Sequence, residues 1–509
     1  AYMEQHRADW GLPGMTLCLA DASGFTMTIA SGLADVDKKI PVDSRQLFQV
    51  GSISKMMTAL TLWSLIDERK LAPDALVRDL LPGLVIRDGA GVTVQHLLDH
   101  VSGLPGGPPL FSEQGLWSGS TPGSHWTYSN AGYSIAGMIA ARVGGAPFPE
   151  LVERRVLKPI GMNSSVGGLF ARDRARHAQG YQPTFLDRVS PRPAPLSTAP
   201  WVDSDSAAGC VAATTDDMAR FLQFLLRLSR GKGAPVFSDR TARRFLADPV
   251  EGWGPNARYG NGIARITVDG RKLLHHTGGM VGFSSALHVD PAAGVAAFAS
   301  SNVSYLLGYR PRDVTIQALR LMRARGATAP APAPTKAIVQ NPERYVGAYA
   351  AADRAGFEIA ADGDALVLKR GGATSVFQPA GDLFATTDPL FPLGLAFDLD
   401  GETATRAWAL DKEFRRDGKG PFAPRPPERL ARLAGRYDND DPWQGSIFIV
   451  ARDGALYLNN TDRLIELREN EYRIGAEIWS PERVEFSSFI AGRPEILRLS
   501  GSPFQRRFG

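Results

Sequence analysis

The sequence has 509 residues, of which 44% are hydrophobic and 22% are charged, an ordinary balance for a globular protein. A chain of this length is too long for one hydrophobic core, so two or three domains are expected. The formal net charge is only +4 and the Lys and Arg residues are scattered, which argues against nucleic-acid binding. No apolar run reaches the length of a membrane-spanning helix.

The N-terminal region begins with strand patterns and continues into a helix. Apolar and polar residues alternate over residues 14–21 and 24–32, which predicts two paired strands. Residues 55–71 are apolar around almost the whole helical circumference, and a helix of that kind is buried. Cys18 lies in the first strand pattern and is interpreted as a small buried hydrophobic residue, without a disulfide to Cys210.

The rest of this region predicts another helix and a group of strands. Residues 215–228 have an amphipathic helical pattern, with Thr215 or Asp216 as the N-cap. Successive antiparallel strands and a final helix follow, at residues 260–268, 283–290, 294–301 and 311–323. Strands near both ends with helices between them predict one sheet that brings the ends of the region together, beside a helical region.

An Ala-Pro-rich segment marks the clearest domain boundary. Its alternating residues, at 327–336, predict an extended linker, and a second Pro-rich joint lies near residue 425. We therefore predict a mixed domain over residues 1–326 and two β domains over residues 337–424 and 425–509.

The two C-terminal segments resemble each other. Gly347 in "YVGAY" and Gly435 in "LAGRY" are 88 residues apart, and Phe-x-Arg patterns near the segment ends place Arg416 and Arg506 90 residues apart. Alternating apolar runs separated by Gly and Asp turns predict two related antiparallel β modules, each a small barrel. The alternative is chance similarity between β-rich segments.

A serine and a lysine stand three residues apart at the start of the predicted buried helix. On a helix this spacing puts Ser52 and Lys55 on one face, about one turn apart. Gly51 permits a tight turn, and a helix N-terminus favours negative charge near Ser52. Desolvation would lower the pKa of Lys55 and make a neutral amine available as a base. The plainer alternative is a serine cap with a lysine that reaches solvent.

A second candidate motif is "YSN", residues 128–130, just before a small apolar helix. A tyrosine hydroxyl near a lysine ammonium ionises more easily, so Tyr128 is a candidate general base. Asn130 is a candidate donor to a substrate carbonyl and a candidate partner of Lys55. The alternative is an aromatic core residue followed by an Asn cap.

The third candidate motif is "HTGG", residues 276–279, before a strand-like run. Gly278 and Gly279 let a substrate lie close to a strand edge, and such an edge can pair with an extended peptide. An ordinary turn is the alternative for His276 beside two glycines. Arg265, on a strand nearby, is a candidate partner for a carboxylate.

His96 and His100 have an i, i+4 spacing that can hold zinc. No third ligand is visible beside them in the sequence. Core or capping roles are therefore predicted for both histidines, and no metal or other cofactor is expected.

Together and in this order, the three motifs resemble those of the serine β-lactamase and penicillin-binding protein family, whose class A members carry Ser-x-x-Lys, Ser-Asp-Asn and Lys-Thr-Gly. Tyr-Ser-Asn and His-Thr-Gly are similar to the class C branch, and more closely to its D-aminopeptidases and D-alanyl-D-alanine carboxypeptidases. Stretches such as "VQHLLDHVSGLP" and "KPIGMNSS" extend the resemblance over most of residues 10–325. It implies an α/β (α+β) β-lactamase-like fold, with an antiparallel sheet flanked by helices and a helical subdomain, followed here by the two barrel-like domains.

The resemblance implies a role for each residue of the first two motifs. Ser52 would be the acylated nucleophile, and Lys55 would help to deprotonate it. Tyr128 would act as general base in acylation and would activate water in deacylation, while Asn130 would orient the substrate.

The third motif would complete a catalytic and substrate-binding site. Thr277, Gly278 and Gly279 would bind substrate, and the backbone N–H groups of Ser52 and Gly279 would form the oxyanion hole. His276 would be catalytic, at the position where β-lactamases have lysine. This departure argues against an efficient β-lactamase, because that position helps to hold the antibiotic's carboxylate.

These roles describe a serine hydrolase that forms an acyl-enzyme on Ser52, with a peptidase as the first hypothesis. Its substrates would be short peptides, including D-residue-containing or linear non-ribosomal ones. A carboxylesterase of the same family and a non-catalytic penicillin-binding or sensor protein are the alternatives. In D-aminopeptidases, a loop from the last barrel restricts the site; residues 437–446 are one candidate for such a loop, and a solvated turn is the alternative.

The expected partner is a small peptide or ester substrate, with no nucleic acid and no membrane span. The oligomeric state stays open, with a homodimer as one option. Because the chain begins at Ala1 and not at methionine, a processed N-terminus and a periplasmic or secreted location are expected, with the cytoplasm as the alternative.

Overall fold

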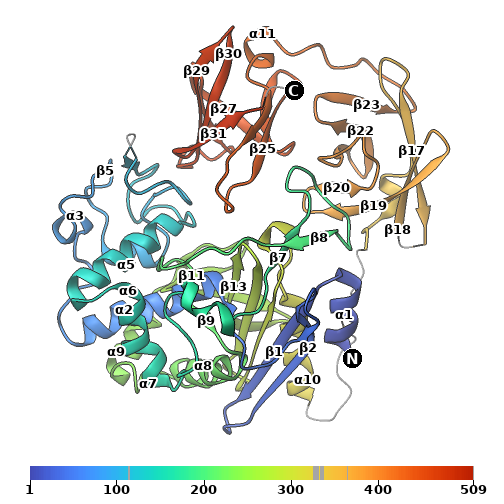
Figure 1. Ribbon diagram of the computed structural model, residues 1–509. Coiled ribbons are helices and arrows are strands. Elements are labelled where there is room, and N and C mark those ends of the chain that lie inside the picture. The colour runs from blue at the N-terminus through green and yellow to red at the C-terminus, as the bar shows by residue number, and fades with distance from the viewer. Residues whose placement is uncertain (113–114, 325–331, 333–337, 364, 508–509) are drawn as a thin grey trace. The chain divides into compact units, whose positions relative to one another are not determined.

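The computed structural model describes residues 1–112, 115–324, 332, 338–363 and 365–507 (Figure 1). The chain divides into two compact units. The first comprises residues 1–8, 12–182 and 197–333, and the second comprises residues 9–11, 183–196 and 334–509. The predicted linker, residues 327–336, lies outside the described residues except for Pro332. None of the described helices is long and apolar enough to cross a membrane.

The first unit is built on a nine-stranded antiparallel sheet in the order β10-β11-β12-β13-β14-β15-β1-β2-β3. Within it, β1 (Gly14–Asp21) pairs with β15 (Val295–Ser301), and Cys18 lies opposite Phe298. This pairing joins the two ends of the unit, as the sequence predicts. The other strands are β2 (Thr26–Asp35), β3 (Ile40–Pro41), β10 (Val250–Glu251), β11 (Arg258–Gly260), β12 (Ile263–Val268), β13 (Arg271–Met280) and β14 (Phe283–Asp290).

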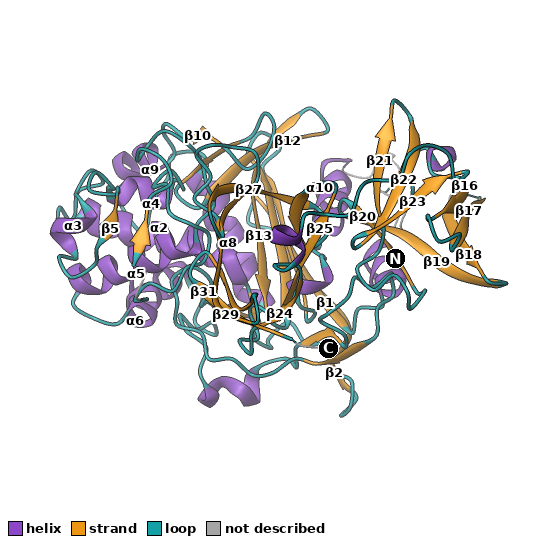
Figure 2. Ribbon diagram, turned by 90° about the horizontal axis from the view of Figure 1, so that it is seen from above, coloured by secondary structure: helices purple, strands orange, loops and turns teal. Residues whose placement is uncertain are grey.

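Helices cover both faces of this sheet (Figure 2). On β14, Leu287 belongs to the main hydrophobic core, to which α8 (Thr215–Leu228) contributes. The next residue, His288, points to the opposite face and contacts the Thr315 hydroxyl of α10 (Arg312–Ala324) at 2.8 Å. The side-chain alternation of a strand therefore places the two helices on opposite faces.

The two long core helices agree with the sequence, with one correction. In α2 (Ser54–Asp67) every residue except the last is buried, as the all-round apolar pattern predicts. The helix α8 begins at Thr215, but its N-cap is Thr214, whose hydroxyl accepts a hydrogen bond from the Asp217 N–H at 3.2 Å. The prediction of Thr215 or Asp216 as the cap is wrong because Thr214 already supplies an oxygen at the right spacing.

Shorter elements complete the part of the chain before residue 325. They are α1 (Tyr2–Trp10), β4 (Phe48–Gln49), α3 (Val77–Leu80), β5 (Ile86–Arg87), α4 (Val94–Leu98), β6 (Leu116–Trp117), α5 (Asn130–Gly144), α6 (Phe148–Val152), α7 (Lys158–Ile160), β7 (Tyr181–Pro183), β8 (Leu196–Thr198), β9 (Ala212–Ala213) and α9 (Asp239–Phe245).

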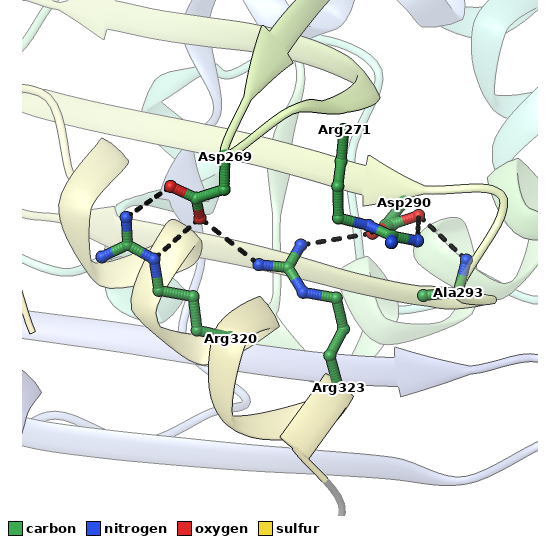
Figure 3. Close-up of polar contacts among 6 residues, drawn as sticks. All are labelled: Asp269, Arg271, Asp290, Ala293, Arg320 and Arg323. Atoms are coloured by element: carbon green, nitrogen blue, oxygen red, sulfur yellow. Dashed lines mark hydrogen bonds and ion pairs between the residues drawn. The ribbon is translucent and has the colours of Figure 1, made fainter. Parts of the chain in front are cut away.

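An ion-pair network ties α10 to the sheet (Figure 3). Asp290, at the end of β14, is fully buried and accepts hydrogen bonds from Arg271 at 2.5 Å and from Arg323 of α10 at 3.2 Å. A more exposed carboxylate, Asp269, pairs with Arg320 of the same helix at 2.8 Å. Burial alone would raise the pKa of Asp290, but the hydrogen bonds from Arg271, the Ala293 N–H and Arg323 lower it below its usual value.

Replacement of Asp290 by asparagine should lower the free energy of unfolding at pH 7 by about 3 kcal/mol, because it leaves two arginines without their buried partner. The pKa of this carboxyl is lower in the folded state, so its stabilisation is present above the unfolded pKa and is lost as the pH falls through the folded pKa. Urea unfolding at pH 7 and at acidic pH measures both effects. The matched variant Asp269→Asn removes two partly exposed ion pairs, with Arg320 and Arg323, and should cost under about 1 kcal/mol; equal losses in the two variants would contradict this account.

The second unit contains two eight-stranded antiparallel modules. The first has the order β20-β19-β18-β17-β16-β23-β22-β21, and the second is a closed barrel of β24 to β31. In the first module, Phe384 of β20 forms an isolated bridge with Leu395, just before β21. The strands are β16 (Gly347–Ala350), β17 (Gly356–Asp362), β18 (Ala365–Arg370), β19 (Ala373–Ala380), β20 (Leu383–Thr386), β21 (Ala396–Asp400), β22 (Thr403–Ala409), β23 (Lys412–Arg416), β24 (Gly435–Asp438), β25 (Ser446–Arg452), β26 (Ala455–Leu458), β27 (Asp462–Arg468), β28 (Glu471–Ile474), β29 (Arg483–Ile490), β30 (Arg493–Leu499) and β31 (Ser502–Arg506), with α11 (Glu428–Ala431) before β24.

The two modules share a set of contacts at matching positions. Tyr349 lies opposite Arg416 in the first module, and Tyr437 lies opposite Arg506 in the second. Each tyrosine hydroxyl donates to the carbonyl four residues before it, at 2.9 Å and 2.7 Å respectively. Each arginine donates to carbonyls in the segment that precedes the module's first strand. The sequence repeat therefore corresponds to one structural plan used twice.

Candidate active site

Ser52 lies in a tight turn that leads into α2. The turn, Gly51–Ile53, is a 3-10 helix, so Ser52 stands two residues before the α-helix begins. Gly51 has a positive φ of 56°, a conformation that glycine adopts at little cost. A Cβ at Gly51 would lie 2.6 Å from the Gly279 nitrogen. The turn is therefore pressed against β13, and glycine is the residue that fits there.

Lys55 is fully buried in the first turn of α2 and makes three polar contacts. Its Nζ lies 3.0 Å from Ser52 Oγ, 2.7 Å from Asn130 Oδ1 and 2.7 Å from the Ala208 carbonyl oxygen. It also lies 4.8 Å from the centre of the Tyr128 ring. The lysine thus contacts residues of both of the first two motifs and does not reach solvent.

These contacts suit Lys55 to act as a base. Burial lowers its pKa well below that of a free lysine, which favours the neutral amine. A neutral amine has two hydrogens and one lone pair. The Asn130 and Ala208 carbonyl oxygens can only accept, so they take the hydrogens, and the lone pair faces the Ser52 hydroxyl. In this state Lys55 is positioned to remove the Ser52 proton.

Tyr128 contacts the same serine. Burial raises the pKa of Tyr128, and the neighbouring Ser52 side chain and the charge of Arg310 only partly offset this effect. Tyr128 is therefore a neutral phenol at neutral pH. In this state it can pass a proton between neighbouring groups. The sequence argument assumed that a lysine ammonium helps Tyr128 to ionise, but the buried surroundings of Tyr128 disfavour the ionised form.

Asn130 is the first residue of α5 but does not cap this helix. The N-cap is Ser129, whose hydroxyl accepts from the Gly132 N–H at 3.0 Å and donates to the Pro105 carbonyl at 2.6 Å. The alternative interpretation of Asn130 as the cap is therefore wrong. Its side chain remains available to hold Lys55.

The sequence predicted the third motif just before a strand. In the structure, the motif lies within a strand, β13. The buried His276 ring places Nδ1 2.6 Å from the Thr277 carbonyl and Nε2 3.1 Å from the Tyr259 hydroxyl. A carbonyl can only accept, so Nδ1 carries the hydrogen and Nε2 accepts from Tyr259. Burial lowers the pKa of His276 well below its usual value, so the ring is neutral at neutral pH. It does not supply the positive charge that a lysine would bring to this position.

Gly278 allows β13 to cross close to the turn that carries Ser52. A Cβ at this position would lie 1.9 Å from the Val50 carbonyl oxygen and 2.3 Å from Ser285 Oγ. The Ser285 hydroxyl itself donates to the Val50 carbonyl at 2.8 Å. The close crossing brings the backbone of Gly279 to the turn, where the predicted oxyanion hole would form.

Part of one edge of β13 is open. The strand β12 pairs with β13 only from Arg271 to His275, whereas β14 follows the other edge to Met280. Among the described strands, none pairs with residues 276–280 on the β12 side. An edge of this kind offers N–H and C=O groups that can pair with an extended backbone.

Arg310 is a neighbour of the site that the sequence motifs did not indicate. A Cβ at Gly279 would lie 2.4 Å from its Nη2, so the guanidinium lies against that glycine. Its Nη1 donates to the Tyr309 carbonyl at 2.6 Å, and within the described part of the chain it forms no ion pair. Burial lowers the pKa of Arg310. This partly buried cation is available for an anionic group of a substrate.

Two further aromatic residues lie near Tyr128: Trp253, which the sequence motifs did not indicate, and His100, for which a core or capping role was predicted. Trp253 has a positive φ of 77°, an outlier for a bulky residue, and its ring centre lies 4.8 Å from that of His276. His100 packs on Tyr128 with ring centres 4.4 Å apart, and its Nδ1 accepts from the Ser129 N–H at 3.1 Å. Backbone strain is often found at functional sites, but no local sequence pattern marks Trp253.

Other sequence candidates lie apart from this group. His96 forms a capping box with Thr93, and no group of three potential metal ligands comes together in the described ranges. Cys18 and Cys210 are buried and unbridged. Arg265 lines a different cavity, described below.

Comparison with known proteins gives the class of this site. The Beta-lactamase family model matches residues 1–322. The chain therefore belongs to the β-lactamase family and is a serine hydrolase. Both the family and the fold class predicted from the sequence are confirmed.

Individual relatives extend this result. Penicillin-binding protein 4* of Bacillus subtilis (strain 168) is 24% identical over 441 residues, which are 78% of this chain and 92% of that protein. The D-aminopeptidase of Gluconobacter oxydans (strain 621H) is 27% identical over 278 residues, 51% of this chain and 50% of that enzyme. The octameric penicillin-binding protein homologue from Pyrococcus abyssi has the same fold, with a TM-score of 0.58 and 19% identity over 93% of this chain and 98% of that one.

Proposed function

We propose that this serine hydrolase is a peptidase that cleaves short peptides, including peptides with D-residues. The observation that carries the proposal is the open edge of β13 over residues 276–280, beside the Ser52–Lys55 pair. This edge can hold the backbone of a peptide by strand pairing, whereas a simple ester does not need it. The similarity to a D-aminopeptidase supports the same substrate class.

In the proposed reaction, Ser52 Oγ attacks the substrate carbonyl while its proton passes to Lys55 Nζ, 3.0 Å away. The N–H groups of Ser52 and Gly279 would stabilise the oxyanion. Lys55 would then return this proton through Tyr128 to the leaving amine as the C–N bond breaks, which leaves an ester on Ser52. Water would attack this ester with its proton accepted through the same groups and passed back to Ser52 Oγ, and the acid product would be released.

Arg310 and His276 bear on which peptides would fit. Arg310 lies against Gly279 as a cation without an ion pair in the described ranges, and we infer that it binds the carboxylate of a peptide with a free C-terminus. His276 is neutral at neutral pH because burial lowers its pKa, so it would not replace the carboxylate-binding lysine of a β-lactamase. Efficient β-lactam hydrolysis is therefore not expected.

A substrate panel tests the proposal. It comprises D- and L-alanyl p-nitroanilides, a D-Ala dipeptide with a free or an amidated C-terminus, and p-nitrophenyl acetate. We expect turnover of amides, with a higher kcat/KM for the free-carboxylate dipeptide than for its amide. Turnover of the ester alone would replace the peptidase by a carboxylesterase, and turnover of nothing would favour a non-catalytic binding protein.

The variant Arg310→Met separates carboxylate binding from catalysis. It should lower kcat/KM for the free-carboxylate dipeptide by about tenfold or more, because a charge-assisted hydrogen bond is lost. The kcat/KM for the amidated dipeptide should change little, and the ratio of the two values is the readout. An equal loss for both substrates would rule out the assigned role of Arg310.

A further inference from the structure

The first unit has a cavity that is formed where β11, β12 and β13 run beside the segments that follow α8 and α9. Its volume is about 510 Å³, within the usual range for small-molecule sites. None of the three sequence motifs contributes a residue to its lining. The cavity is thus a separate feature of the unit that carries the active site.

Three cations line this cavity, namely Arg258, Arg265 and Lys272. Arg258 of β11 lies directly opposite Arg265 of β12. Lys272 of β13 lies opposite Thr267, which is two residues from Arg265. Because residues two apart on a strand share a face, the three charges lie on one face of the sheet. Like charges placed directly opposite each other destabilise a sheet.

One carboxylate, Glu251 of β10, lies opposite Arg258 in the sheet, but it does not line the cavity. Among the described residues that line the cavity, none is Asp or Glu, and none of the three cations is in an ion pair with another described residue. Arg265 is half-buried and donates one N–H to the Leu246 carbonyl, which leaves four N–H groups for other partners. Burial, and then the charge of Arg258, lower the pKa of Arg265. An anion between the cations would remove this unfavourable arrangement.

On the same side of the sheet, the lining also includes the apolar residues Leu246, Pro249 and Leu274. We propose that the cavity binds a small soluble phosphate monoester whose ester group is apolar. A phosphate monoester carries a charge of about −1.5 to −2 at pH 7, which matches three cations better than a carboxylate does. Its oxygens suit the planar forks of two arginines, while the apolar group would contact the leucine and proline side chains.

Calorimetric titration of the full chain with phenyl phosphate at low salt tests the proposal. We expect binding at one site. The double variant Arg258→Gln/Lys272→Gln should weaken this binding by about tenfold or more, because charge-assisted hydrogen bonds are lost. Both side chains are exposed, so the variant should fold normally. Arg142→Gln, which removes an exposed arginine of α5 outside the cavity, is the matched control and should bind as the unmodified chain does.

Two further ligands test whether the cavity recognises both the phosphate and the apolar group. Inorganic phosphate should bind more weakly than phenyl phosphate because it lacks the apolar group, and benzyl alcohol should not bind because it lacks the charge. No heat of binding with millimolar phenyl phosphate, or an affinity unchanged in the double variant, would overturn the proposal. So would inorganic phosphate binding as tightly as phenyl phosphate. Arg265→Met provides a second loss-of-binding variant, with thermal melting to verify that it folds.

Discussion

Replacement of Ser52 by alanine should lower kcat by a factor on the order of 10⁴ to 10⁶, because the acyl-enzyme can no longer form. The same variant should unfold at nearly the same temperature as the unmodified chain. Ser52 lies in the turn before α2. The N-cap of this helix is Ile53, which makes no side-chain capping bond. Removal of the Ser52 hydroxyl therefore costs the helix little. Single-turnover kinetics and thermal melting measure the two effects.

A neighbouring serine provides the matched control. Ser54 is buried, and its Oγ accepts a hydrogen bond from the Val211 N–H at 3.1 Å. Ser54→Ala leaves that buried donor without its partner and should cost about 1–3 kcal/mol of stability, while most of the activity remains. A fluorophosphonate probe should label Ser52 in the unmodified chain and in Ser54→Ala. Activity that survives in Ser52→Ala, or labelling at another residue, would contradict the acyl-enzyme on Ser52.

Local patterns were sufficient to predict much of the fold. The segment 283–290, predicted as a strand, coincides with β14. The all-round apolar pattern after Ser52 became a buried α2, and the pairing of β1 with β15 followed from strands at both ends of one region. Such elements are decided by side-chain periodicity, which is present in the sequence itself.

Properties that depend on tertiary packing could not be predicted in this way. The neutral state of His276 follows from its burial, and its Nε2 accepts from the hydroxyl of Tyr259, which is 17 residues away in the chain. Arg310 and Trp253 belong to no motif, and only the folding of the chain brings them next to Gly279 and His276, respectively. Likewise, no change in composition indicates that residues 183–196 belong to the second unit.

Replacement of Lys55 by methionine should lower kcat/KM at neutral pH by a factor on the order of 10³ or more, because the proton acceptor for Ser52 is lost. Its stability should fall by about 1–3 kcal/mol, because the Asn130 and Ala208 carbonyl oxygens lose their donor, although a desolvated amine is replaced by an apolar side chain. In the unmodified chain, kcat/KM should rise with pH through the lowered pKa of Lys55, because only the unprotonated amine accepts a proton. This dependence should be absent from whatever activity remains in Lys55→Met.

The variant Lys55→Arg distinguishes a base from a fixed positive charge. An arginine stays protonated at every accessible pH and would place an unpaired charge where Lys55 is fully buried. This variant should therefore be both inactive and less stable than Lys55→Met. Substantial activity in Lys55→Arg would mean that Lys55 acts as a cation that stabilises developing negative charge, and the removal of the Ser52 proton would then have to be assigned to Tyr128. The comparison thus decides between the two candidate bases that contact the same hydroxyl.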